Sequence, residues 1–194
     1  MLGLVRYFWL DLLPPLPEGW RPVLRRYVEL WPRALTPYAV AKEVDLTTSA
    51  VYRSVYALAR NRLILPAGRD YRATVKGAIA LLVEEEDPRW LKAVRKIWGI
   101  GLDDITTAFY LVALGAAIRR LGFTIREAYI CNWAASQAYI ATQLDSLRLP
   151  PAVEEAVRPL LRYPSETALE CNGIQPNRLG RNLADQAKIA EDSA

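Results

Sequence analysis

The strongest constraint on the fold of this chain is a run of 14 residues without a charge, from Ile105 to Ile118. A helix that is apolar on every side has no surface to give to water, so it is normally buried at the centre of a helical bundle or at a subunit interface. The run is too short to cross a bilayer, which takes about 20 apolar residues. It therefore predicts that the second half of the chain is a helical bundle or a dimerisation domain built around this segment.

The apolar residues follow a helical period in most of the chain, and capping residues mark where helices begin. In the first half these caps are Thr36 before Pro37, Thr47 or Thr48, and Thr74. Before Thr74 the pattern changes to two short extended segments around a turn at residues 66–70, which predicts a β-hairpin. The helices expected in this half cover residues 21–33, 36–44, 47–60 and 75–85.

Similar signals divide the second half. Asp87–Pro88 opens one helix, and Thr124 with Glu127 has the spacing of a capping box for a helix over residues 125–144. Another helix follows Pro150–Pro151, and the polar residues beyond it are expected to be flexible. The fold class is therefore mainly α. We expect four parts: an apolar N-terminal arm (1–20), a first domain (21–86), a helical domain (87–164) and a polar tail (165–194).

The N-terminal arm, MLGLVRYFWLDLLPPLP, is apolar but contains Arg6 and Asp11 and ends in prolines. It is too short to span a bilayer and lacks a small-residue cleavage site for secretion. We expect it to dock on its own protein or on a partner chain, and its low charge makes a membrane-surface role the weaker alternative. With no secretory signal and only two cysteines, the chain is expected to be cytoplasmic.

The net positive charge of the chain arises in one segment. Residues 17–85 hold 11 Lys or Arg and 7 Asp or Glu, which accounts for the whole formal charge of +4, while the rest of the chain is neutral. A local positive excess favours an anionic partner for the first domain. The neutral remainder indicates a different role for the second half, such as packing or pairing.

The composition argues against an enzyme. The chain has no histidine, so it lacks the commonest general base and the imidazole metal ligand. Cys131 lies in an apolar helix, Cys171 has no activating neighbours, and two cysteines alone cannot form a structural zinc site. The carboxylates of residues 84–87 diverge around a helix, and those at 103–104 serve as caps. We therefore expect no catalytic residue, no metal and no cofactor.

The segment LTTSAVYRSVYALARNRLI, residues 46–64, has two opposed faces when it is drawn as a helix. The apolar stripe consists of Val51, Val55 and Leu58; the opposite face holds Ser49, Arg53, Tyr56 and Arg60, with Tyr52 at its shoulder. This polar face is either an ordinary solvated surface or an interface for DNA. Guanidinium groups can bond a guanine edge, hydroxyls can bond bases or phosphates, and a helix N-terminus attracts phosphate.

One motif lies within this helix, and a second motif follows it. Residues 49–58 have the form Ser-x-Val-x-Arg-x-Val-x-x-Leu, and residues 71–77 have the form Tyr-x-x-Thr-x-x-Gly, with Lys76 at a basic position. Together with the predicted helices and hairpin, residues 21–85 resemble the winged helix-turn-helix domains of MarR-like, ArsR-like and PadR-like bacterial and archaeal transcription regulators. The resemblance implies that the helix over 47–60 enters the major groove of DNA and that the hairpin, the wing, lies along an adjacent backbone.

The same resemblance supplies candidate contacts. Base edges and nearby sugars would be contacted by Ser49, Tyr52, Arg53 and Tyr56. Phosphates would be contacted by Thr47, Thr48, Arg60, Arg69 and Arg72. The expected partners are double-stranded DNA and a second copy of the chain, bound through residues 87–164. A symmetric dimer would read a palindromic site with half-site centres about 34 Å, or one turn, apart.

One position departs from the family pattern. Between the recognition helix and the wing the family usually has glycine, because the backbone there favours a positive φ, whereas this chain has Arg62. Asn61 tolerates the left-handed region better than most residues. We therefore expect Asn61 to take over the turn and to shift the end of the helix by about one residue.

Two further alternatives concern ligands and partners. Aromatic residues at Phe109, Tyr110, Tyr129 and Trp133 can line a pocket for a planar apolar effector, or simply form a packed core. No feature of the sequence identifies an effector. The preferred function is a sequence-specific transcription regulator; the alternative is an architectural DNA-binding or protein-interaction subunit of replication or transcription machinery, because the fold serves both roles.

Overall fold

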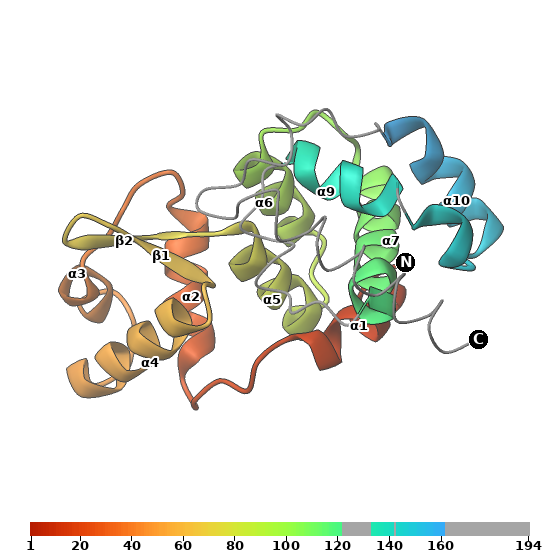
Figure 1. Ribbon diagram of the computed structural model, residues 1–194. Helices are drawn as coiled ribbons and strands as arrows, with labels where there is room; N and C mark the ends of the chain where they lie inside the picture. The colour runs from red at the N-terminus through yellow and green to blue at the C-terminus, as the bar shows by residue number, and fades with distance from the viewer. Residues whose placement is uncertain (122–132, 142, 162–194) are drawn as a thin grey trace, which may run out of the picture.

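The uncharged segment lies within helix α7 (Asp104–Leu121), and its side chains are buried on almost every side. The structure is a computed structural model that describes residues 1–121, 133–141 and 143–161. The helices packed against α7 are α1 (Leu2–Trp9), α6 (Arg89–Trp98), α9 (Trp133–Ala141) and α10 (Pro151–Val157) (Figure 1). They all belong to the same chain, so α7 is covered without a second subunit. In the described part of the chain, no helix is long and apolar enough to cross a membrane.

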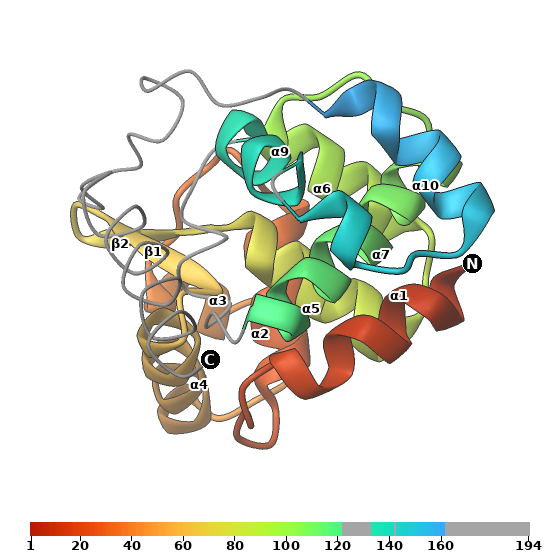
Figure 2. The same cartoon turned by 45° about the vertical axis from the view of Figure 1, so that its right-hand side comes forward.

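Residues 20–85 contain helices and one hairpin in the predicted order. The helices are α2 (Trp20–Glu29), α3 (Pro37–Ala41), α4 (Thr48–Arg60) and α5 (Val75–Glu85), and the strands β1 (Ile64–Ala67) and β2 (Asp70–Ala73) lie between α4 and α5. Short 3-10 segments lie outside this range: η1 (Leu10–Leu12) precedes α2, η2 (Leu144–Ser146) follows α9, and η3 (Arg158–Leu160) follows α10. The predicted fold class, mainly α with one small hairpin before further helices, is confirmed (Figures 1 and 2).

The predicted caps are present at three helix starts. A threonine hydroxyl oxygen accepts a hydrogen bond from the backbone N–H three residues later, which satisfies one of the donors that a helix N-terminus leaves open. The pairs are Thr36 with Ala39 at 3.0 Å, Thr47 with Ala50 at 3.3 Å, and Thr74 with Gly77 at 3.2 Å. Of the two caps considered for α4, Thr47 is therefore the one used.

Two predicted helices are shorter than expected. The helix predicted to reach residue 33 ends at Glu29, because Pro32 disfavours the helical conformation of the residue before it. The helix predicted to reach residue 44 ends at Ala41, where the backbone passes into a tighter turn with Glu43 N–H donating to the Val40 carbonyl at 3.0 Å. The capping box at 124–127, both cysteines and the tail from 165 lie outside the described residues, as do residues 125–132 and 142 of the helix predicted over 125–144. The described part of that helix is α9, from Trp133 to Ala141.

The hairpin is a tight antiparallel pair. Ile64 lies opposite Ala73 and Ala67 lies opposite Asp70, which leaves two residues in the turn, and Gly68 takes a positive φ of 70° there. Leu35, in the connection between α2 and α3, exchanges two backbone hydrogen bonds of 2.9 Å with Tyr71. The hairpin is therefore attached to the helical part of its domain along the β2 edge.

The turn after α4 differs from the prediction. Asn61 has φ −90°, and it is Arg62 that adopts the left-handed conformation, with φ 57°. The helix ends at Arg60, so the expected shift does not occur. Asn61 stays on the helical side because its side-chain amide donates to the Ala57 carbonyl at 2.9 Å. The backbone thus keeps the turn that glycine usually makes, although an arginine occupies it.

The start of α5 is joined to this turn by three residues of the Tyr-x-x-Thr-x-Lys-Gly segment. The Thr74 hydroxyl lies 2.8 Å from the Arg62 carbonyl, and the Lys76 ammonium donates to the Asn61 carbonyl at 2.8 Å. A Cβ at Gly77 would lie 2.3 Å from the Leu63 carbonyl oxygen, so glycine is required for α5 to approach the chain this closely. Lys76 therefore stabilises the carbonyl end of α4.

Helix α1 is packed closely on α7 and α5. The Trp9 indole N–H donates to the Leu111 carbonyl at 2.7 Å, and Val5 and Trp9 are fully buried. A Cβ at Gly115 would lie 2.8 Å from the Trp9 indole nitrogen, so this glycine makes room for the helix. Arg119 donates to the Phe8 carbonyl at 2.9 Å and so caps the C-terminal end of α1.

The acidic segment at the end of α5 is neutralised by arginines from three other helices. The pairs are Glu84 with Arg21 at 2.5 Å, Glu85 with Arg25 at 2.8 Å and Arg89 at 3.1 Å, and Glu86 with Arg6 at 2.5 Å. These ion pairs join α1, α2 and α6 to the C-terminal end of α5. Among the described residues, no cluster of three His, Cys, Asp or Glu side chains is placed to hold a metal ion.

Candidate nucleic-acid interface

Helix α4 separates its residues as the helical wheel predicts. Val51, Val55 and Leu58 are buried against α2 and α3, as is Ser54 on the same side. The residues predicted to contact bases, Ser49, Tyr52, Arg53 and Tyr56, are all exposed, and so is Arg60. Tyr56 keeps 71 % of its surface accessible, so its ring has no place in the core of the described chain. The structure therefore brings these five side chains together on one outward face.

The N-terminal end of α4 presents hydroxyl groups beside the backbone N–H groups of its first turn. The Thr47 and Ser49 hydroxyl oxygens lie 3.2 Å apart, while the Thr47 oxygen also caps the helix. Thr48 and Ser49 are exposed. Since the N-terminus of a helix carries partial positive charge, this end of α4 can accept an anionic oxygen, with the hydroxyls as additional donors.

The hairpin adds two exposed arginines. Arg69 lies in its two-residue turn, and Arg72 lies on β2 directly opposite Leu65 of β1. Leu65 is also exposed, whereas the next residue along β2, Ala73, is buried. Arg72 and Leu65 consequently share the solvent face of the hairpin. Figure 1 shows the hairpin and α4 on the same side of the molecule, with α3 beside them.

The electrostatics of this side of the molecule depend on which arginines have carboxylate partners. On α2, Arg21, Arg25 and Arg26 all form ion pairs. In the described part of the chain no carboxylate is paired with any of four arginines on α4 and the hairpin: Arg53, Arg60, Arg69 and Arg72. Four arginines without a carboxylate partner in the described chain therefore lie on α4 and the hairpin, together with one hairpin carboxylate, Asp70.

Tyr38 is an exposed residue of this side that the sequence prediction did not include. It follows Pro37 in the first turn of α3, keeps 58 % of its surface accessible, and has the Lys42 ammonium 4.5 Å from its ring centroid. Val40 is the buried residue of this short helix. A wheel drawn from Val40 places Tyr38 on the outward side, so the signal that identified the α4 residues could also have found Tyr38.

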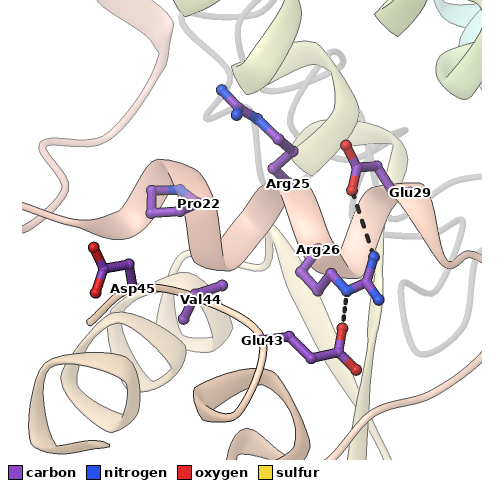
Figure 3. Close-up of a pocket in the computed structure, with 7 residues that line it drawn as sticks. All are labelled: Pro22, Arg25, Arg26, Glu29, Glu43, Val44 and Asp45. Carbon is purple, nitrogen blue, oxygen red and sulfur yellow. Dashed lines mark hydrogen bonds and ion pairs between the residues drawn. The ribbon is translucent and has the colours of Figure 1, made fainter. Parts of the chain in front are cut away.

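A depression of about 580 Å³ lies between α2 and the connection from α3 to α4 (Figure 3). Its charged side chains are mostly paired: Arg26 contacts both Glu29 and Glu43, and Arg25 pairs with Glu85 outside the depression. Asp45 also lines it. Because the guanidinium groups already have carboxylate partners, this depression offers no strong site for an anion.

The aromatic residues proposed as a pocket are packed against one another where the structure describes them. The Tyr110 and Trp133 ring centroids lie 4.1 Å apart, and Trp98 contacts both rings. Tyr110 is fully buried, its hydroxyl lies 2.5 Å from the Ser136 hydroxyl, and burial raises its pKa. Phe109 is half-buried, and Tyr129 lies outside the described residues. The observed contacts are those of an aromatic cluster.

The chain matches no family model, no curated protein and no solved structure. The candidate interface is therefore defined by its own geometry. It is an exposed helix face with hydroxyls at the positive end of the helix, beside a two-stranded hairpin, with four arginines that lack carboxylate partners in the described chain.

Proposed function

We propose that this protein is a sequence-specific DNA-binding transcription regulator that uses a winged helix-turn-helix domain and acts as a homodimer. In this proposal α3 and α4 are the helix-turn-helix, and the β1–β2 hairpin is the wing. The observation that carries it is the charge distribution described above. Among the described residues, the arginines on the outward side of α4 and the hairpin have no carboxylate partner, whereas those on α2 are paired.

In the proposed complex α4 lies in the major groove. Arg53 is the main candidate for a bidentate contact to guanine, with Ser49, Tyr52 and Tyr56 near neighbouring bases and sugars. Thr47, Thr48, Arg60, Arg69 and Arg72 bind phosphates, which supplies affinity without sequence preference. A dimer presents two such surfaces, so the site is a palindrome with half-site centres about 34 Å apart.

A second candidate function is favoured by the exposed apolar residues on the same side. Tyr38, Tyr52, Tyr56 and Leu65 are all exposed there. Tyrosines are enriched in protein interfaces, so this surface can alternatively hold another protein or bind DNA only architecturally. Selection of binding sites from random DNA duplexes separates these functions. One enriched palindrome supports the regulator, and no enrichment supports the alternative.

Arginine variants test the proposed contacts directly. Arg53→Ala is expected to weaken binding to the selected site by roughly 5- to 150-fold, the equivalent of about 1–3 kcal/mol, with a smaller effect on random DNA. Arg69→Ala is expected to weaken binding to both kinds of DNA by similar factors. The matched control is Arg120→Ala, an exposed arginine on α7, which should change neither. Unchanged DNA retardation by the Arg53 and Arg69 variants at low salt would overturn the proposal.

A further inference from the structure

A small cleft lies between the C-terminal end of α2 and helix α6, with a volume of about 240 Å³. Its lining combines apolar and charged side chains, and none of them is among the residues proposed to contact DNA. Some of the lining residues belong to the first domain and others to α6, so a ligand in this cleft contacts both halves of the chain.

The apolar side chains of the cleft form a fixed surface, which we call its floor. The floor consists of Val28, Trp31, Trp90, Ala93 and Ile97. Val28 and Trp90 are buried, and the other three are partly buried against the core. The Trp90 indole N–H already donates a hydrogen bond of 2.9 Å to a carboxylate of its own chain. The floor therefore offers apolar contact and requires no hydrogen bond, which suits the face of a flat ring.

Two of the charged side chains at the cleft are neutralised within the chain. The Arg89 guanidinium pairs with Asp87 at 2.9 Å and lies 4.5 Å from the centroid of the Trp90 ring. The Glu29 carboxylate lies 3.8 Å from the Arg26 guanidinium. Neither residue therefore presents an unpaired charge to a ligand.

Lys92 and Lys96, in contrast, have no carboxylate partner in the part of the chain that the structure describes. Both are exposed, and their spacing of four residues places them side by side on α6. The Lys96 ammonium donates to the Trp31 carbonyl at 2.9 Å. Because an ammonium carries three N–H donors, Lys96 keeps donors for a ligand. The cleft thus combines an apolar floor with two ammonium groups at its edge.

This combination indicates the chemistry of the occupant. DNA phosphates would use the lysines and leave the floor empty, and a neutral apolar molecule would do the reverse. A flat ring that bears a carboxylate uses both. Pockets for drug-sized ligands measure about 300–1,000 Å³, so this cleft suits a molecule of one or two rings. The depression in Figure 3 differs, because its guanidinium groups are already paired with carboxylates.

We propose that the cleft between α2 and α6 binds a small aromatic carboxylate. The ring lies on the apolar floor, and the carboxylate lies between the ammonium groups of Lys92 and Lys96. This site goes beyond the proposed function and does not rest on it, because ligand binding is measured on the full chain without DNA.

Isothermal titration calorimetry of the full chain with 2-naphthoate at low salt tests the site. Saturable binding is expected, and 2-naphthamide, which has the same rings without the charge, should bind at least about twofold more weakly. Lys92→Gln and Lys96→Gln should each weaken binding of the acid by roughly two- to fivefold and leave binding of the amide unchanged. Lys42→Gln is the matched control, since Lys42 is also an exposed lysine beside an aromatic ring but lies on α3, outside the cleft. It should bind the acid like the wild type.

The Lys92 variant keeps the test independent of folding, because Lys92 is exposed and makes no hydrogen bond or ion pair within the described chain. Three results would overturn the proposal: no saturable binding of the acid up to about 5 mM, equal affinities for acid and amide, or unchanged affinity in both α6 variants. If the acid does not bind and the α6 variants weaken binding to random duplex DNA as Arg69→Ala does, the lysines belong to a DNA contact instead. If the acid binds as expected and no form of the protein binds DNA, the site stands and the proposed function fails.

Discussion

Arg62 occupies a backbone conformation that is unfavourable for a residue with a side chain. Its φ of 57° lies in the left-handed region, which costs a non-glycine residue roughly 1–2 kcal/mol. Part of this cost is recovered because arginine loses less backbone entropy on folding than glycine does. The turn is nevertheless kept, because Thr74 and Lys76 bind the carbonyls on either side of it.

Arg62→Gly is therefore expected to stabilise the protein by about 0.5–1 kcal/mol, measured by urea unfolding. The control is Asn61→Gly, which should destabilise it, because Asn61 has an ordinary φ of −90° and would lose its hydrogen bond to the Ala57 carbonyl. Stabilisation by Asn61→Gly together with destabilisation by Arg62→Gly would show that the left-handed residue is Asn61, as the sequence alone suggested.

At the scale of elements, the C-terminal end of α5 is stabilised by charges from other helices. The side chain of Glu85 is only 14 % exposed, and burial by itself raises the pKa of its carboxyl. Hydrogen bonds from Arg25, Trp90 and Arg89 outweigh that effect, so its pKa is lowered overall. A carboxyl with a lowered pKa in the folded state stabilises the protein above its ordinary pKa and loses that contribution as the pH falls through the lowered value.

Glu85→Gln is expected to lower the free energy of unfolding at pH 7 by about 1–3 kcal/mol and to flatten its decline below pH of about 4.5. Unfolding by urea from pH 7 to pH 3 measures both effects. Glu86→Gln provides the comparison, since its ion pair with Arg6 is exposed and should contribute less than about 1 kcal/mol. Equal losses in the two variants, or parallel pH curves for Glu85→Gln and the wild type, would contradict this role of Glu85.

The elements were predictable to the extent that local signals determine them. Helix starts at Thr36, Thr47 and Thr74 follow from capping, which involves residues three positions apart. Helix ends were less predictable: α2 stops at Glu29 because of Pro32, although the apolar period continues to Trp31. The left-handed turn at Arg62 depends on Thr74 and Lys76, which lie more than ten residues away in sequence and could not be placed by a local rule.

At the scale of the whole molecule, the exposed face of α4 was predictable because a helical wheel uses only the sequence of that one helix. Ion pairs between distant elements were not predictable from the sequence. The ion pairs of Arg21 and Arg25 with the end of α5 join residues 60 or more positions apart, and they compensate the charge of two arginines on α2. Sequence counting located the charge excess in residues 17–85, whereas only the structure shows that the arginines of α2 are paired with carboxylates.

The salt dependence of DNA binding should reflect this distribution of charge. Each phosphate contact that neutralises a charge releases counterions, and the slope of log K against log salt changes by about 0.9 per contact. Arg60→Ala, Arg69→Ala and Arg72→Ala are each expected to reduce the slope by about one unit per bound chain, and by about two for a dimer on its palindrome.

Arg21→Ala is the control for this measurement, because it removes the same charge from α2 but from a guanidinium already paired with Glu84 at 2.5 Å. Its slope should stay close to that of the wild type, since Glu84 holds Arg21 at the end of α5 and away from the proposed groove contacts. The slopes can be obtained from fluorescence anisotropy between 50 and 200 mM salt, roughly the range in which such contacts change affinity strongly. An Arg21 variant that alters the slope as much as the hairpin variants would mean that net charge, and not the surface of α4 and the hairpin, governs binding.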